Sequence, residues 1–468
     1  MVGPIARHFQ STQNIKGRRH GVCIQHSYPL TMQAAANALQ KHLGPAPTDA
    51  GAEYKGRGDG STMKALAWFG AEDVRVIDAP VPDITEPNDV ILQVTGSTIC
   101  GSDLHLYHGE IMALQKGDIL GHEFMGKVEK VGPNVTNLKP GQRVVASFQI
   151  ACGTCRYCKE KLSSFCDNTN SSSLQNMMYG TRDAGFFGYS HFTGGFPGGQ
   201  AEYVRVPFGN VNLLPIPDNV TDEQAIYLSD VLPTSYHSVV DTGVEEGDVV
   251  GIWGLGPIGQ CAARWAKMKG ASRVIGIDTV PSRLAFAKEK SGIEVIDFKE
   301  FTDVPKKLME MVPGGLDVAL DCGTFHEPKT ILHKVQKTLM LETDVPETIN
   351  EMLLSVRKMG RCGLIAAYAG FANGVNVGAL MEKGVRLIGN GQAPVHKYWE
   401  EILGFIQEGK FDPTFMITHR VPIEDMAKLY AAFDKRQAGV EKVFVETKFS
   451  APPSAGCPTL TRVDDWPA

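Results

Sequence analysis

A glycine-rich turn between two apolar segments constrains the fold of this chain more than any other feature. Residues 249–253 are apolar and predict a buried parallel strand, and they lead directly into Gly254-Leu255-Gly256-Pro257-Ile258-Gly259. Residues 258–269 repeat apolar side chains at helical spacing, and a second apolar run, 274–277, ends at Asp278. Strand, turn, helix and strand in this order predict one unit of a doubly wound parallel sheet.

The chemistry of this turn predicts a dinucleotide site. Gly254 permits the tight turn, Gly256 lets the backbone approach a pyrophosphate, and Gly259 lets helix and strand pack closely. The phosphates would meet the start of the helix at Pro257 and Ile258. Asp278 would accept a hydrogen bond from the adenosine ribose, and its charge would repel a 2′-phosphate, which favours NAD over NADP. The alternative is an ordinary glycine-rich turn.

Composition narrows the class of protein. The chain has 468 residues, 43% of them hydrophobic and 21% charged, which is typical of a globular protein of one to three domains. Its net charge of −6 gives no general signature of nucleic-acid binding. The sequence contains no run of 18 apolar residues, so it predicts no membrane span.

The two ends of the chain differ from the rest. Residues 1–62 begin with 48 residues that carry basic side chains and no acid, and glycines follow. This pattern predicts a disordered leader in a cytoplasmic protein, or alternatively a mitochondrial transit peptide. Residues 450–468 are rich in proline and predict a disordered tail.

Between these ends the patterns predict one domain interrupted by another. Residues 63–232 carry short strands and turns, whereas residues 233–390 alternate strands with helices. Residues 391–449 give a helix and then a β-rich end. The nucleotide domain is therefore expected to interrupt a β-rich domain that resumes after it.

Four cysteines at short spacing predict a metal site. Cys152, Cys155, Cys158 and Cys166 could close a tetrahedral zinc site, and a closed site is structural. The alternative is a zinc ribbon that binds nucleic acid, but no dense basic patch accompanies the cluster.

A second group of possible ligands lies upstream. Cys100 and His122 are expected in loops at strand ends. Two such ligands leave room for a third protein ligand and an open position, as catalytic zinc requires. Taken alone, a single His is more often structural, but the Cys and the nearby four-cysteine cluster favour a ligand.

These motifs together resemble those of the zinc-dependent medium-chain alcohol dehydrogenases. In order along the chain they are Cys100-Gly101-Ser102-Asp103, Gly121-His122-Glu123, the lobe 152–166 and the turn 254–259. The resemblance runs from about Met63 to Thr447. It implies an α/β protein in which a GroES-like β-rich catalytic domain is split around a Rossmann domain with a doubly wound parallel sheet.

The resemblance also implies the ligands of a catalytic zinc. Many members place a second Cys before the Rossmann domain, where this chain has Asp230 within residues 228–234. An Asp there resembles the formaldehyde dehydrogenase-like branch, including its glutathione-independent members. Cys100, His122 and Asp230 would then bind the catalytic zinc, with Glu123 behind them or as an alternate ligand.

Further roles follow from the same resemblance. Ser102 would bond the zinc-bound alcohol oxygen, and His105 would take the proton onward through the nicotinamide ribose. The remaining residues would contact the cofactor: Thr234 at the nicotinamide, Arg283 at the adenosine ribose and Lys442 at the pyrophosphate.

The implied function is hydride transfer between a small alcohol or aldehyde hydrate and NAD, with two zinc ions per chain. The family also implies a homodimer or homotetramer joined through the edge of the Rossmann sheet, and no nucleic-acid or membrane partner. Two alternatives remain: a zinc-free reductase of enones or quinones, and a non-catalytic dinucleotide-binding protein. The metal ligands argue against the first, and a metal assay with turnover tests the second.

Overall fold

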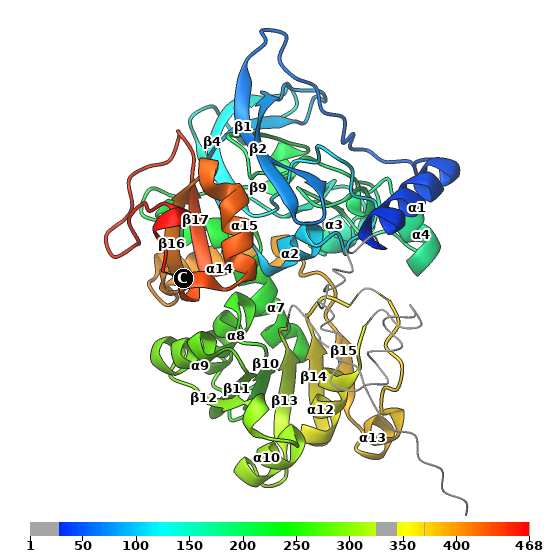
Figure 1. Ribbon diagram of the computed structural model, residues 1–468, viewed down its shortest axis with the longest axis vertical. Helices are drawn as coiled ribbons and strands as arrows, with labels where there is room; N and C mark the ends of the chain where they lie inside the picture. Colours follow the sequence, from blue (N-terminus) through cyan, green and yellow to red (C-terminus); the bar gives the residue numbers. More distant parts are fainter. Residues whose placement is uncertain (1–27, 324–343, 369, 468) are drawn as a thin grey trace, which may run out of the picture.

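The computed structural model describes residues 28–323, 344–368 and 370–467, which form a β-rich unit and an α/β unit. In Figure 1 the β-rich unit lies above the α/β unit, and the chain passes from the first to the second at α7 (Val231–Thr242). The predicted α/β class and its split organisation are confirmed. None of the described helices is long and apolar enough to cross a lipid bilayer.

The α/β unit is built on a parallel sheet of six strands. The strand order is β12-β11-β10-β13-β14-β15, and every neighbouring pair is parallel. Parallel neighbours require crossover connections, and helices on both faces supply them. The strands are β10 (Val249–Trp253), β11 (Arg273–Asp278), β12 (Glu294–Asp297), β13 (Leu316–Asp321), β14 (Val356–Leu364) and β15 (Arg386–Gly389).

The helices of this unit follow the strands in sequence. They are α8 (Pro257–Met268), α9 (Pro281–Phe286), α10 (Val304–Met311), α12 (Glu347–Ser355) and α13 (Val377–Glu382). In α8, Gly256 is the N-cap and Pro257 stands at the first helical position. Proline suits that position because it lacks only an N–H that would be unpaired there. The turn between β10 and α8 therefore falls where the glycine pattern predicts it.

The β-rich unit is organised around a seven-stranded sheet. Its path is β16-β17-β3-β4-β5-β9, and β8 pairs with β3. The strands are β3 (Val90–Ser97), β4 (Phe124–Val131), β5 (Arg143–Ala146), β8 (Tyr203–Val206), β9 (Leu213–Pro215), β16 (Ile417–Pro422) and β17 (Lys442–Glu446). Two antiparallel strand pairs accompany it: β1 (Thr62–Gly70) with β2 (Asp73–Pro80), and β6 (Gln149–Ile150) with β7 (Gly185–Phe186). Since β17 joins β3, the chain returns to its first unit after the nucleotide sheet.

Two helices of the last segment complete the packing. The helix α14 (Val395–Gln407) contacts α7, and α15 (Met426–Asp434) covers β2. One hydrophobic cluster runs through both units, and in it the ring of Trp265 stacks on Phe411 at 3.8 Å between centroids. The two units therefore share a continuous apolar core.

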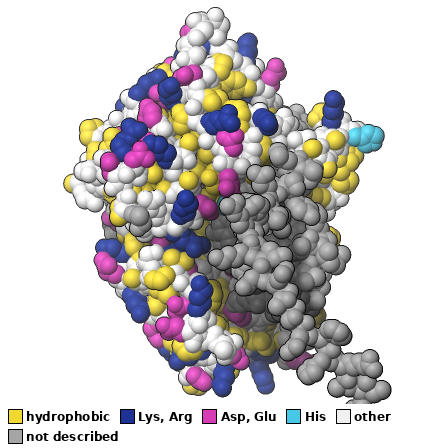
Figure 2. Space-filling model, viewed as in Figure 1, with side chains coloured by type: hydrophobic (Ala, Val, Ile, Leu, Met, Phe, Trp, Pro, Cys, Tyr) yellow, Lys and Arg dark blue, Asp and Glu magenta, His cyan; other side chains and the backbone are white. Residues whose placement is uncertain are grey.

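The N-terminal segment departs from its prediction. Residues 28–62 pack on the β-rich unit, so the expectation of disorder is wrong for them, while residues 1–27 lie outside the described part. The helix α1 (Tyr28–Leu43) lies against α4 (Ser173–Tyr179), and Ala46 N donates to Ser171 O at 2.9 Å. Both helices project from the body, and exposed apolar side chains gather there (Figures 1 and 2): Leu39, Leu43, Met177, Met178 and Tyr179.

The C-terminal tail is also ordered where disorder was expected. Arg420 of β16 is buried, and its guanidinium binds Glu223, Glu446 and the carbonyl of Ala451. Further along, the side chain of Trp466 is buried beside α15. Proline content alone predicts a flexible segment, because composition does not reveal that a buried arginine upstream needs acceptors from the tail.

Removing this arginine should destabilise the β-rich unit. Arg420→Ala leaves the buried carboxylate of Glu223 without its cation, which typically costs about 3–5 kcal/mol of unfolding free energy. We expect a lower urea midpoint and faster proteolysis after residue 450. Lys428→Ala is the control, because the Lys428–Asp464 pair holds the same tail but is exposed, and should change stability by less than about 1 kcal/mol. Equal effects of the two substitutions would contradict the role of the buried network.

Candidate functional site

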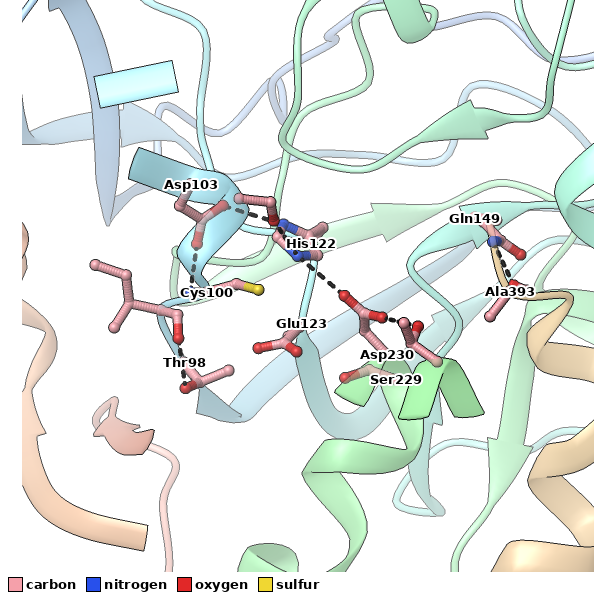
Figure 3. A network of polar contacts seen from close by, with 12 residues as sticks. Thr98, Cys100, Asp103, His122, Glu123, Gln149, Ser229, Asp230 and Ala393 are labelled. Atoms are coloured by element: carbon pink, nitrogen blue, oxygen red, sulfur yellow. Dashed lines mark hydrogen bonds and ion pairs between the residues drawn. The ribbon is translucent and has the colours of Figure 1, made fainter. Parts of the chain in front are cut away.

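Three segments bring the predicted catalytic ligands together. The strands β3 and β4 are antiparallel and Ser97 pairs with Phe124, so the end of one strand lies beside the start of the other. Cys100 follows β3 at the start of α2 (Gly101–Tyr107), and His122 precedes β4. Asp230 stands at the start of α7. One ligand atom from each of Cys100, His122, Glu123 and Asp230 lies within 4.8 Å of the others, and their side chains converge in Figure 3.

The electrostatics of this cluster favour a cation. The Nε2 atom of His122 lies 3.4 Å from an oxygen of Asp230, and its Nδ1 atom lies 3.0 Å from Asp103. Burial lowers the pKa of His122, but the two carboxylates outweigh it and raise the pKa overall. Burial raises the pKa of Asp230, whereas contacts with His122 and Thr234 lower it overall. The buried carboxylates around a single imidazole therefore leave negative charge that a divalent metal would neutralise.

Asp103 was not singled out from the sequence as a site residue, yet it organises the ligands. Its carboxylate accepts from the backbone N–H of Cys100 at 2.9 Å and from the amide of Gln200 at 3.2 Å, and it faces His122. A carboxylate that orients a metal-binding imidazole is a common outer partner of zinc ligands. The signal for Asp103 in the sequence was its place three residues after Cys100 at the start of a helix, because an acid there accepts from the backbone N–H of the residue that caps the helix.

The structure gives Lys442 other partners than the predicted pyrophosphate, and that contact stays a prediction. Lys442 is 1% exposed, and its ammonium forms an ion pair with Glu123 and donates to the carbonyl of Ile99 at 3.1 Å. Burial lowers the pKa of Lys442, but Glu123 raises it overall, so the ammonium is kept charged. Glu441, the residue before β17, lies 3.5 Å from Arg283 in the nucleotide unit.

The other predicted residues near the cluster lie on two helices, Ser102 and His105 on α2 and Thr234 on α7. Ser102 Oγ lies 3.4 Å from His122 Nε2, and His105 is one turn further along α2 on the same face. The hydroxyl of Thr234 donates to Asp230, so Thr234 orients this ligand. Nothing described here places Thr234 against a nicotinamide, and that contact stays a prediction.

Aromatic side chains border the cluster. The rings of Phe148 and Tyr189 each meet the ring of His122 edge-on, with centroids 6.2 Å apart. Burial raises the pKa of the Tyr189 hydroxyl, which is therefore neutral. Sequence patterns marked neither ring, because Phe148 lies in the short link between β5 and β6 and Tyr189 lies in the segment 168–199, which has no regular period.

The glycine turn has the shape of a dinucleotide cradle. Gly254 adopts φ of 86°, and a Cβ there would lie 2.8 Å from the backbone of Gly323. A Cβ on Gly259 would lie 1.9 Å from the carbonyl of Gly254, so only glycine allows this packing. The space beside Gly256 is bordered by the Arg283 guanidinium, 3.6 Å from where a Cβ would be.

Asp278 has a second task besides the one predicted. Its carboxylate accepts from the backbone N–H groups of Leu255 at 2.7 Å, Thr279 at 2.6 Å and Val280 at 2.9 Å. These bonds hold the glycine turn against the end of β11. The remaining lone pairs of the carboxylate can accept from a ribose hydroxyl.

The four-cysteine lobe has the geometry of a closed metal site. All four sulfurs lie within 4.8 Å of one another, and two pairs, Cys152 with Cys158 and Cys155 with Cys166, are each 3.9 Å apart. Sulfurs bound to one zinc at about 2.3 Å lie roughly 3.8 Å apart. Backbone N–H groups of Thr154 and Cys155 point at the Cys152 sulfur at 3.4 and 3.3 Å, as they would toward a thiolate.

Comparison of the sequence with known proteins identifies the family to which these motifs belong. Residues 86–218 match the family profile described as "Alcohol dehydrogenase GroES-like domain", and residues 257–331 match "Zinc-binding dehydrogenase". A zinc-type alcohol dehydrogenase-like protein of Schizosaccharomyces pombe is 42% identical over 88% of this chain and 97% of its own length. The glutathione-independent formaldehyde dehydrogenase of Pseudomonas aeruginosa is 33% identical over 82% of this chain and 97% of its own.

A solved structure agrees with the fold. The alcohol dehydrogenase TADH from Thermus sp. ATN1 superposes with a TM-score of 0.68 at 31% identity, over 82% of this chain and 99% of that one. With two metal-binding clusters and a dinucleotide turn, the chain is a zinc- and NAD-dependent oxidoreductase that acts on CH–OH groups. It belongs to the zinc-dependent medium-chain alcohol dehydrogenases.

Proposed function

We propose that this protein transfers a hydride between a small alcohol or aldehyde hydrate and NAD, at a zinc held by Cys100, His122 and Asp230. The observation that carries the proposal is the convergence of these three side chains within 4.8 Å, with more negative charge than His122 alone can balance. When bound, zinc supplies a Lewis acid that lowers the pKa of a substrate hydroxyl, and NAD supplies the hydride acceptor.

The protein's own side chains have distinct parts in this reaction. Ser102, beside His122, receives the hydroxyl proton and passes it toward His105 on the same helix face. Asp103 and Thr234 hold His122 and Asp230 in position. Glu123, paired with Lys442, lies behind the ligands as a buried countercharge or an alternate ligand. The rings of Phe148 and Tyr189 restrict the pocket and exclude water.

The cofactor side of the site rests on the turn 254–259. Gly254, Gly256 and Gly259 shape it, and Pro257 and Ile258 begin the helix that faces the phosphates. Asp278 selects NAD through its charge, and Arg283 borders the cradle. A zinc-free reductase of the same superfamily would not need a Cys, a buried His and a buried Asp facing one another.

Loss of a catalytic ligand should remove one zinc and leave the fold intact. Cys100→Ser should lower kcat by at least about 100-fold, the upper end of the effect of outer partners of a metal ligand. Metal analysis should find one zinc per chain in place of two, with an unchanged melting temperature. Cys457→Ser is a matched control, because Cys457 lies in the tail, outside both clusters. Full activity with two zincs in Cys100→Ser would refute the assignment.

Loss of a lobe cysteine should instead weaken folding. Cys155→Ser breaks a closed site whose metal binding contributes directly to folding free energy. We expect a lower melting temperature, more aggregation and one zinc per chain. A variant that melts like the wild type would show that the lobe 152–166 does not depend on metal.

The cofactor preference should depend on the charge of Asp278. Asp278→Asn keeps an acceptor oxygen for the turn but removes the repulsion of a 2′-phosphate. The ratio of kcat/KM with NAD to that with NADP should fall at least about tenfold, and the melting temperature should also fall, because the Asn NH2 group faces a backbone N–H that the second Asp278 oxygen accepted. Asp278→Ala should lose stability as well, because three backbone N–H groups lose their acceptor. An unchanged ratio in both variants would mean that Asp278 supports the turn alone.

The substrate is best sought among small molecules. The formaldehyde dehydrogenase relative and the Asp230 ligand support formaldehyde hydrate as the first compound to assay, with and without glutathione. Primary and secondary alcohols complete the panel. NADH formation without glutathione would support the glutathione-independent branch, and activity with glutathione alone would contradict it.

Assembly and location are further parts of the proposal. A homodimer or homotetramer through β15 is supported by its place at the sheet edge and by exposed apolar side chains nearby, such as Val377 and Met381, and light scattering tests it. We favour a cytoplasmic location. A mitochondrial transit segment would have to end before Tyr28, because α1 packs on the catalytic unit; fractionation of cells distinguishes the two.

A further inference from the structure

The proposed proton relay ends at His105, and the side chain of His105 contacts the carboxylate of Glu110, which has no part in the proposed reaction. His105 Nδ1 lies 2.6 Å from an oxygen of Glu110, and the backbone N–H of Glu110 donates to the carbonyl of His105 at 2.8 Å. The side chain of His105 is 14% exposed, whereas that of Glu110 is 51% exposed. A double link therefore joins the end of α2 to the segment 108–114 that follows it.

This segment is held in turn by the N-terminal helix. Gln33 of α1 is 4% exposed, and its side-chain N–H group donates to the carbonyls of Gly109 at 3.0 Å and Ile111 at 2.5 Å. The side-chain oxygen of Gln33 accepts from Leu114 N at 2.8 Å. Gly109 and Ile111 are the two neighbours of Glu110, so one buried side chain holds the backbone on both sides of it.

The backbone of this segment needs such support. Ala113 adopts φ of 64°, a left-handed conformation that costs free energy for a residue with a Cβ. Conformations of this kind persist when the surroundings fix them. The three hydrogen bonds of Gln33 supply the fixing contacts, and they come from a part of the chain more than 70 residues upstream in sequence.

We propose that Glu110 is a positioning residue for the proton relay at His105, and that Gln33 of the N-terminal helix holds Glu110 in place. This inference rests on the proposed relay through Ser102 and His105. It assigns a function in the reaction to a helix that lies outside both the metal-binding and the dinucleotide-binding motifs.

The chemistry of the pair gives the reason. An ionised carboxylate only accepts, so the hydrogen between the two groups belongs to Nδ1 of His105. In the neutral ring this leaves Nε2 as the nitrogen that accepts a proton. In alcohol oxidation the substrate O–H bond breaks, Ser102 takes that proton as it releases its own toward His105 Nε2, and His105 delivers one proton to solvent. The hydride goes to NAD, so one NADH and one proton form per carbonyl product.

A double-substitution experiment tests Glu110. Glu110→Gln, His105→Asn and the combination are compared in the zinc-loaded enzyme with saturating NAD. General acid–base groups typically contribute about 10²–10⁴-fold, so we expect His105→Asn to lower kcat about 100-fold and Glu110→Gln about tenfold, with KM for NAD little changed. In the His105→Asn background, Glu110→Gln should have no further effect on kcat. Multiplying effects would overturn the proposal, because they would show that Glu110 acts independently of His105.

A second comparison tests Gln33, with a readout besides activity. Gln33→Ala should raise hydrogen–deuterium exchange in the peptide 108–114 and lower kcat toward the value of Glu110→Gln. Gln40→Ala is the matched control, because it is the same residue type on the same helix but accepts from Leu174 N in α4. It should leave the exchange of 108–114 and kcat as in the wild type. Equal exchange of that peptide in both variants would overturn the role of Gln33.

The outcomes separate this inference from the function on which it rests. If His105→Asn retains full kcat with two zincs bound, the relay itself is refuted, and the positioning proposal with it. If His105→Asn lowers kcat but Glu110→Gln does not, the relay stands and Glu110 has no positioning role. Both variants should keep two zincs per chain, since neither residue is a metal ligand.

Discussion

The antiparallel pairing of β3 with β4 is the constraint on which the catalytic site depends. Because Ser97 lies opposite Phe124, the chain leaves one strand at Cys100 and enters the next at His122 on the same edge of the sheet. The third ligand, Asp230, begins α7, whose buried face packs into the apolar core shared with the nucleotide sheet. The metal site is therefore complete only when both units are folded and packed together.

Buried charge explains why the chain returns to its first unit after the nucleotide sheet. Carboxylates of Asp103, Glu123 and Asp230 are buried around one imidazole, which is costly without compensating cations. Lys442 supplies one such cation, and it reaches Glu123 because β17 lies beside β3 in the sheet. The split of the domain thus has an electrostatic consequence. Its last strand, β17, carries the Lys442 ammonium that neutralises Glu123 beside the first strands. A bound metal would neutralise the negative charge that remains.

The sequence predicts local features of this protein well and distant contacts poorly. The glycine turn, the strands around it and the four-cysteine lobe each lie within about thirty residues, so spacing alone reveals them. Asp230 required a resemblance to a family, since an isolated Asp has no pattern of its own. The ion pair of Lys442 and the buried network at Arg420 were not predicted, because partners more than 190 residues away, Glu123 and Glu223, decide where those side chains point. The helix α1 was missed for another reason, namely that it carries no broad apolar stripe.

The way α1 is attached suits a positioning role. Among its described side chains, 33–43, the buried apolar contact with the body is made by Ala36 with Ala113 and Leu174, so burial of area there contributes little to holding the helix. Its side-chain amides instead bond to named backbone atoms of the segment 108–114. Apolar contacts are non-directional and tolerate small shifts, whereas hydrogen bonds weaken steeply when distance or angle changes. An attachment made by buried amides therefore fixes where backbone atoms lie, and a proton relay needs fixed positions because proton transfer requires its partners within hydrogen-bond reach.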